Sequence, residues 1–186
     1  MGWWFRKPTV RVTSKGRIDV GSLRRLVFDH QGVQDAAYSH QELDQFVAIS
    51  STFKQCTFEH LTIRSACFGG GRKESVYEAC SFDGSKIDCM AAGVARFVGC
   101  TFRDVHLFSF FGLSVSMIDC VFSGRLHKVA FYGANPESRK RNDFRGNDFR
   151  EALLDDVGFR EGIDLTLQRF PTGWVKPDDP YRNRAT

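Results

Sequence analysis

Hydrophobic residues recur every five positions along most of this chain, a spacing that neither the 3.6-residue turn of an α-helix nor the two-residue repeat of a β-strand produces. Between residues 77 and 122 the frame holds without a slip, at Tyr77, Phe82, Ile87, Ala92, Phe97, Phe102, Leu107, Gly112, Met117 and Phe122. The same frame runs from residue 33 to residue 68, and an insertion at residues 69–73 separates the two runs. A second, mostly small or aliphatic residue lies two positions before each of these. The pattern predicts short extended segments that turn a corner every five residues.

A longer period lies over the five-residue frame. Four similar steps follow one another as Cys56-Thr57-Phe58, Cys80-Ser81-Phe82, Cys100-Thr101-Phe102 and Cys120-Val121-Phe122, and from Cys80 onward they are twenty residues apart. Twenty residues hold four pentads, which suits one coil of a solenoid whose successive coils stack on one another. The chain is therefore expected to form four faces, with one column of inward residues on each face.

The columns follow from this register. The first contains Tyr38, Phe58, Phe82, Phe102 and Phe122, the second Leu43, Ile63, Ile87 and Leu107, and the fourth Val33, Phe53, Tyr77, Phe97 and Met117. The third column pairs Phe46 with Ala48, Ala66 with Phe68, Met90 with Ala92, and Phe110 with Gly112. A large residue always accompanies a small one, as a densely packed interior of constant volume requires.

A capping box offers a rival interpretation of residues 39–46. Ser39 followed by Glu42 is typical of the start of a helix, which would run through Phe46. Because Phe46 and Ala48 obey the volume rule of the third column, the coil is the preferred prediction.

The ends of the chain depart from the repeat. Residues 1–32 are predicted to form an N-terminal cap with a short hairpin, in which residues 10–12 and 18–20 flank a turn at residues 14–16. Such a cap would cover the open first coil, whose strand edges are otherwise unpaired. Residues 33–165 are assigned to the solenoid, and residues 166–186 to a C-terminal cap and an exposed tail.

Two consecutive pentads resemble a known repeat. Asn142-Asp143-Phe144-Arg145-Gly146 and Asn147-Asp148-Phe149-Arg150-Glu151 are similar to the unit of the pentapeptide-repeat proteins, which runs small or polar, Asp or Asn, Leu or Phe, then two variable residues. The resemblance covers roughly residues 33–165. It implies the fold of that family, an all-β, right-handed quadrilateral parallel β-helix with four short faces per coil.

The six cysteines narrow the chemistry. Their spacings include no CxxC pair. In stacked coils about 4.8 Å apart, four of them would form a row on the first face, where free thiols acting as small buried hydrophobic groups are favoured over disulfides or a metal site. The absence of an apolar leader suggests a reducing, cytoplasmic location. No apolar run approaches the roughly 18 residues of a membrane span, and no cofactor is expected.

The charge of the repeat body disfavours gyrase inhibition, a function known in the pentapeptide-repeat family. Residues 51–165 contain fifteen Lys and Arg and fifteen Asp and Glu, so the repeat body is neutral, and the net charge of the whole chain is +4. Pentapeptide-repeat proteins that inhibit DNA gyrase resemble duplex DNA and need a strongly acidic surface. A topoisomerase modulator acting by DNA mimicry is therefore a disfavoured alternative.

No motif for catalysis stands out. The five histidines share no metal-ligand spacing, and the glycine run at residues 69–71 lacks the Lys-Ser/Thr of a phosphate loop. We therefore expect a non-enzymatic scaffold or adaptor that binds a protein partner.

Two surfaces are candidates for binding. The insertion at residues 69–73 and the loop at residues 133–141 both follow the third column, so they are predicted to leave one corner together and form a basic ridge of Arg72, Lys73, Arg139, Lys140 and Arg141. This ridge would suit an acidic protein, a nucleic acid or another anion, although solvated loops without a ligand explain the same charges. An apolar contact patch is predicted at Phe108, Phe111, Leu113 and Ile118, which occupy outward positions. It would serve a partner or a second copy of the chain, unless the N-terminal segment covers it with Trp3 and Trp4.

Overall fold

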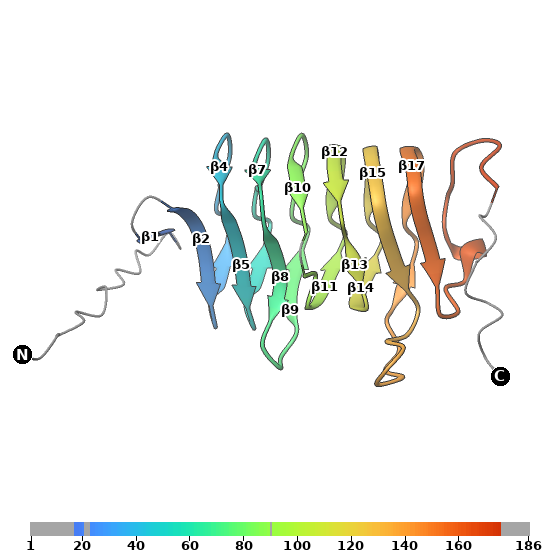
Figure 1. Cartoon of the computed structure of the whole chain (residues 1–186), viewed down its shortest axis with the longest axis horizontal. Coiled ribbons are helices and arrows are strands. Elements are labelled where there is room, and N and C mark those ends of the chain that lie inside the picture. The colour runs from blue at the N-terminus through green and yellow to red at the C-terminus, as the bar shows by residue number, and fades with distance from the viewer. Residues whose placement is uncertain (1–16, 21–22, 90, 176–186) are drawn as a thin grey trace, which may run out of the picture.

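Short parallel strands stack side by side along the long axis of the molecule (Figure 1). The computed structural model describes residues 17–20, 23–89 and 91–175. Within these ranges the chain is all-β, with one 3-10 turn, η1 (Leu165–Leu167), and no α-helix. The strands build a solenoid of about five turns, so the predicted parallel β-helix is confirmed.

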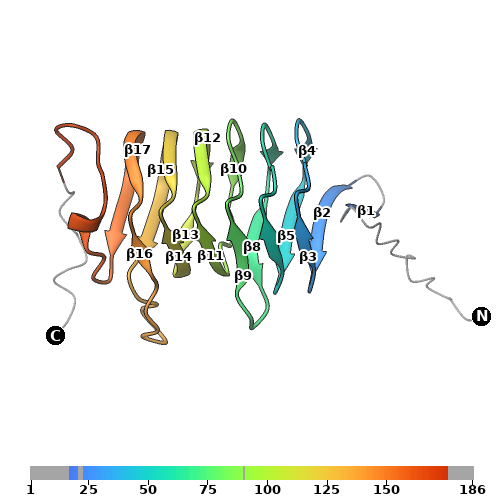
Figure 2. The ribbon, with the colours of Figure 1, turned by 180° about the vertical axis from the view of Figure 1, so that it is seen from behind.

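The strands fall into three sheets, which Figure 2 shows from behind. One sheet has the order β1 (Arg17–Val20), β2 (Leu23–Asp29), β5 (Gln45–Ile49) and β8 (Ala66–Gly70). Another has the order β13 (Phe111–Gly112), β15 (Val121–Tyr132), β12 (Thr101–Phe108), β10 (Lys86–Asp88), β7 (Thr62–Ile63) and β4 (Glu42–Leu43), with β17 (Asp148–Arg160) paired to β15. The last has the order β16 (Phe144–Arg145), β14 (Ser114–Ile118), β11 (Val94–Val98), β9 (Ser75–Glu78), β6 (Thr52–Lys54) and β3 (Gly32–Gln34).

The register of these strands reproduces the predicted columns. On the second face Leu43 pairs with Ile63, Ile63 with Ile87, and Ile87 with Leu107. On the fourth face Phe53 pairs with Tyr77, and Phe97 with Met117. The first face is joined by single bridges, such as Thr57 with Ser81, until the longer strands β12, β15 and β17 begin there. Residues 39–46 contain β4 and the start of β5, so the coil prediction holds over the helix.

Stacked aromatic rings form the core of the first face. Consecutive centroids lie 5.4, 5.1, 4.9, 5.0, 4.6 and 5.7 Å apart along Tyr38, Phe58, Phe82, Phe102, Phe122, Phe149 and Phe170. Trp174 stacks on Phe170 at 4.1 Å and ends this row. These contacts show how the residues after β17 cover the last coil.

A row of cysteines lies beside the aromatic row, and an asparagine replaces cysteine in it at the C-terminal end. The four cysteines of the first face are buried, and their Sγ atoms donate to backbone carbonyls, for example that of Cys100 to Tyr77 O at 3.3 Å. All six cysteines are free thiols. In the next coil Asn147 takes the cysteine position, and its Nδ2 donates to Met117 O at 2.9 Å and to Gln168 Oε1 at 3.1 Å. Amides thus satisfy the buried backbone groups where the repeat ends.

The N-terminal boundary differs from the prediction. β2 pairs in parallel with β5, with Leu26 opposite Phe46 and Phe28 opposite Ala48, so the parallel stacking begins before residue 33. Residues 18–20 pair antiparallel with the start of β2, which is a partner other than the predicted one. The other predicted arm, at residues 10–12, lies outside the described residues.

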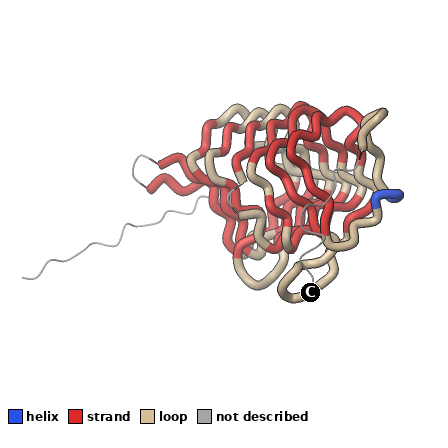
Figure 3. Tube along the Cα trace, turned by 45° about the vertical axis from the view of Figure 1, so that its right-hand side comes forward, coloured by secondary structure: helices blue, strands red, loops and turns tan. Residues whose placement is uncertain are grey.

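Corners separate the faces, as Figure 3 shows by the alternation of strand and loop along each coil. Several corner residues adopt the left-handed conformation, including Gln55 (φ 51°) and Ala79 (φ 51°). At one corner Gly124 (φ 83°) pairs with Val105, and a Cβ on Gly124 would lie 2.4 Å from Val105 O. The register shift there lets Leu126 pair with Leu107 although Leu126 comes one residue early in the five-residue frame.

Candidate functional site

The outward surface of the third face carries a continuous row of apolar side chains. Val27 pairs with Val47, Val47 with Cys67, and Cys67 with Ala91. The residues on either side of Val47, Phe46 and Ala48, are fully buried, whereas Val47 is half-buried and so points away from the core. We call the apolar outward residues of this face the apolar strip: Val27, Val47, Ile49, Cys67, Ala91, Phe111 and Leu113.

The most exposed side chains of the apolar strip lie toward its C-terminal end. Phe111 is 52% exposed and Leu113 is 40% exposed. The next coil does not continue the exposed row. Ala130, the partner of Phe111, is buried, and the Arg160 guanidinium lies 5.9 Å from the Tyr132 ring centroid on the same face. The accessible part of the strip therefore extends from β2 to β13.

Charged residues occupy the other three faces and pair between coils. Arg103 and Asp83 lie 3.3 Å apart on the first face, Arg64 and Asp44 3.4 Å apart on the second, and Lys54 and Glu78 3.1 Å apart on the fourth. Such exposed pairs contribute little to stability, about 0 to 1 kcal/mol each, but they keep these faces hydrated. The third face carries Arg25 and Asp29 in β2, but its strands β5, β8 and β13 contain no charged residue.

The predicted apolar contact patch is only partly brought together. Phe111 and Leu113 belong to the apolar strip, but Phe108 lies on the second face, at the end of β12, and Ile118 on the fourth, at the end of β14. Ile118 is only 6% exposed, so its assignment to an exposed patch was wrong. It lies in register between Val98 and Arg145 on neighbouring coils, and side chains at such positions shield one another.

Phe108 has a different environment. Its ring stacks on that of His127 with centroids 5.4 Å apart, and Lys128 Nζ lies 5.6 Å from the Phe108 centroid. His127 Nδ1 is 2.9 Å from Asp155 Oδ2, and Arg125 Nη2 donates to the same oxygen at 2.5 Å. Phe108 is thus half-buried within a polar cluster on the second face.

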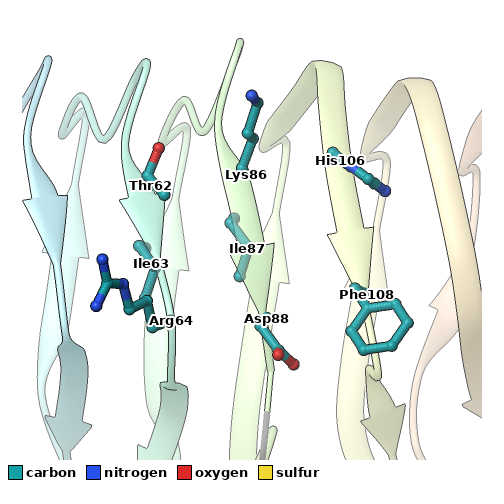
Figure 4. A pocket seen from close by; sticks show the side chains of 8 residues that line it. All are labelled: Thr62, Ile63, Arg64, Lys86, Ile87, Asp88, His106 and Phe108. Atoms are coloured by element: carbon teal, nitrogen blue, oxygen red, sulfur yellow. The ribbon is translucent and has the colours of Figure 1, made fainter.

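A shallow depression of about 250 Å³ lies next to this cluster (Figure 4). It is lined by Thr62, Ile63, Arg64, Lys86, Ile87, Asp88, His106 and Phe108, which belong to β7, β10 and β12 or directly follow β7. Ile63 and Ile87 are buried core residues, and Thr62, Arg64, Lys86 and Asp88 occupy the positions directly before and after them on the outward side. Its mixture of basic and acidic groups on an open sheet surface does not define one ligand chemistry.

The two basic loops leave the same corner. One joins β8 on the third face to β9 on the fourth, and the other joins β15 to β16 across the same corner three coils later. Figures 1 and 2 show both loops projecting beyond the same edge of the stack. At strand spacing three coils correspond to about 14 Å. Four of the five ridge residues, Arg72, Lys73, Lys140 and Arg141, form no ion pair with a described residue, while Arg139 lies 3.6 Å from Glu161.

Hydrogen bonds hold the second basic loop against the apolar strip. Asn142 Nδ2 donates to Leu113 O at 3.0 Å and to Tyr132 O at 2.8 Å. Asn135 Nδ2 donates to Ser114 Oγ at 2.8 Å, while Asn135 Oδ1 accepts from the backbone of Ser138 at 2.9 Å. The loop is therefore fixed directly beside Leu113, although the sequence pattern predicts the basic ridge and the apolar patch as two separate surfaces.

Groups for metal binding are not assembled in the described ranges, and two of the buried thiols there are poor nucleophiles. No three His, Cys, Asp or Glu side chains there are placed to hold a metal ion. Burial raises the pKa of Cys89 to about 12, and the hydrogen-bonded Cys120 together with burial raises the pKa of Cys100 to about 12. These thiols remain protonated and unreactive at neutral pH. Among the described residues no helix has the length and apolarity needed to cross a membrane.

Comparison with known proteins adds no relative. Neither the family models nor the curated proteins with which the chain was compared gave a match. The apolar strip is the feature that sequence reasoning missed, although it had a signal. Val47, Cys67, Ala91 and Phe111 each lie one position before a residue of the third column, so most of the row could have been traced in the sequence.

Proposed function

We propose that this protein is a non-enzymatic binding scaffold of the pentapeptide-repeat type, and that it docks a protein partner through the apolar strip. Parallel sheets are normally covered on both faces, and a large exposed apolar patch marks a contact surface. The observation that carries the proposal is the contrast between faces. Outward residues of the first, second and fourth faces form ion pairs between coils, whereas β5, β8 and β13 of the third face contain no charged residue and present an apolar row with Phe111 52% exposed.

The pentapeptide-repeat assignment is supported by two independent features. The inward residues recur every five positions, and each set of four pentads stacks in register on the next. A cytoplasmic location is part of this proposal and is supported by six free thiols.

Photo-crosslinking tests the docking face. A photoreactive residue replaces Val47 on the third face, and matched variants carry it at Lys86 on the second face or at Lys54 on the fourth. In native lysate we expect a discrete crosslinked protein from the Val47 position alone, and its loss when Phe111→Glu is added. Equal crosslinking from all three faces, or no product from Val47, would overturn the proposal. Sedimentation of the purified protein shows whether the captured partner is a second copy.

Modulation of a topoisomerase is the alternative within the same family resemblance. The equal numbers of acidic and basic residues from 51 to 165 disfavour it, because a mimic of DNA must be strongly acidic. A supercoiling assay with purified protein is expected to show no inhibition.

A further inference from the structure

The apolar strip and the basic ridge meet at one corner. Gly93, before β11, and Leu113, before β14, are the two corner positions between the basic loops. Phe111 lies two residues before Leu113, on the third-face side of the corner. We call this stretch, with Gly93, Phe111 and Leu113 and a basic loop at each end, the interloop corner.

We infer that the interloop corner binds an extended acidic peptide segment of the partner, whose apolar side chains contact Phe111 and Leu113. This inference rests on the proposed function and names the chemistry of the partner. It depends on three properties of the corner: unpaired positive charge at both ends, an apolar centre, and the distance between the ends.

The positive charges are not neutralised within the described chain. Glu74, beside the first loop, is 3.1 Å from Arg96 and is therefore directed to the fourth face, away from Arg72 and Lys73. In the second loop Arg139 is matched by Glu161 at 3.6 Å, which leaves Lys140 and Arg141. Glu137 is the acidic residue of the second loop and reduces but does not cancel its charge. Carboxylates of a bound peptide would complete these pairs and give specificity to the contact.

The distance sets the pattern of the ligand. The loops are about 14 Å apart at strand spacing, and an extended peptide rises about 3.3 Å per residue. The acidic residues at its two ends therefore lie about four positions apart. Side chains of an extended segment alternate, so one or two apolar residues of the intervening stretch would face Phe111 and Leu113. On the fourth-face side of the corner, β11 lies between β9 and β14, and β14 lies between β11 and β16, so a peptide does not bind there by strand addition.

Nucleic acid fits the interloop corner less well. Duplex DNA carries a charge every ~1.7 Å along its axis, so its phosphates would lie over Leu113, which is 40% exposed and apolar. Outside the two loops, residues 51–165 contain ten Lys and Arg against fourteen Asp and Glu, so the repeat body offers no further basic track. An acidic peptide with apolar residues at its centre matches both parts of the surface.

Fluorescence anisotropy with a designed peptide tests this inference. The probe is a labelled Glu-Glu-Gly-Phe-Gly-Glu-Glu peptide, in which the second Glu, the Phe and the third Glu lie on one side of the extended chain. Its controls replace the four Glu by Gln or the Phe by Ser. Charge reversal of one loop (Arg72→Glu with Lys73→Glu, or Lys140→Glu with Arg141→Glu) is expected to weaken binding about tenfold, because two exposed ion pairs are lost. Leu113→Ser should also weaken it, without changing its salt dependence. Lys86→Glu and Leu153→Ser serve as matched controls on the second face and should leave affinity unchanged. Lys86 forms no ion pair with a described residue, and Leu153 is exposed.

The outcomes separate this inference from the proposed function. If the peptide does not bind, or binds equally well after both charge reversals, the inference is overturned, while crosslinking from Val47 still supports the scaffold. If a 20-base-pair duplex binds more tightly than the peptide and loses affinity on charge reversal, the corner is a nucleic-acid site and the inference is also overturned. Loss of Val47 crosslinking removes the proposed function itself. Should Leu113→Ser fail to fold, as judged by its melting curve, the Ser control peptide provides the same test from the ligand side.

Discussion

The ring of Phe110 fills the space in which a side chain at Gly112 would begin. A Cβ built on Gly112 would lie 2.9 Å from Phe110 Cε1, closer than the 3.5 to 4.0 Å at which carbon atoms pack favourably. The same exchange of volume operates along the third face, where Phe46 accompanies Ala48 and Ala66 accompanies Phe68, all of them buried. The interior of this face is therefore specified by pairs of residues rather than by single positions.

Gly112→Ala is expected to destabilise the protein by about 1 to 3 kcal/mol, because the added methyl group forces the Phe110 ring from its position. Adding Phe110→Leu should recover part of this loss by making room. The control is Gly32→Ala in β3, where no atom lies within 4 Å of the new Cβ and little change is expected. Urea unfolding measures all three variants. A loss for Gly112→Ala no larger than that for Gly32→Ala would contradict the volume rule.

Phe82 and Phe102 anchor the middle of the aromatic row. Their rings stack with centroids 4.9 Å apart and an interplanar angle of 4°, and both side chains are buried. Phe82→Ala or Phe102→Ala is expected to cost about 3 to 5 kcal/mol, because the neighbouring coils cannot collapse into the cavity. Thermal and urea melts provide the measurement, with Leu153→Ala as an exposed control. A change as small as that of the control would refute the assignment of the first column.

Periodicity predicts the inward residues of this fold well and the outward ones poorly, for a physical reason. Each inward residue must fill a shared interior, so Ile63, Ile87 and Leu107 repeat one chemistry in register. The exposure of an outward residue depends on neighbours about twenty positions away in the sequence and on the turn at each corner. Phe108 and Ile118 were therefore grouped with Phe111, although five residues along the chain carry a side chain to the next face.

The candidate site shows the same division. The corner shared by the two basic loops followed from counting pentads, because both insertions come after the third column. The hydrogen bonds that join the second loop to the strip, from Asn142 to Leu113 and from Asn135 to Ser114, depend on loop geometry that has no period in the sequence. The proximity of the ridge to the apolar residues could be recognised only in the structure.

Cys67 is expected to be the thiol that reacts first in the folded protein. It is half-buried at an outward position of the apolar strip, whereas the other five cysteines are buried. Alkylation with iodoacetamide at pH 8, followed by mass spectrometry of peptides, should show modification of Cys67 before unfolding and of all six afterwards. Cys67→Ser should abolish the native-state modification. Protection of Cys67 equal to that of Cys89 would show that the strip is covered in solution, and would count against docking there.

Asp148 makes stability depend on pH at the acidic end. Hydrogen bonds from the Arg150 side chain, with Nη2 2.7 Å from Oδ2, lower the pKa of Asp148 to about 2. An unfolded Asp has a pKa of about 3.9, so the native state holds this carboxylate ionised where the unfolded state protonates it. The stabilising contribution is therefore fully present above about pH 4 and is lost as the pH falls toward 2.

Arg150→Ala should raise the pKa of Asp148 toward its ordinary value and remove most of this contribution. We expect the variant to melt at a lower temperature than the wild type at pH 5 and the two to converge as the pH approaches 2. NMR titration of the Asp148 carboxyl carbon measures the pKa directly. Arg72→Ala, which removes an arginine that forms no ion pair with a described residue, should reproduce the wild-type pH profile. A wild-type Asp148 that titrates near pH 4 would show that the Arg150 hydrogen bonds do not persist in solution.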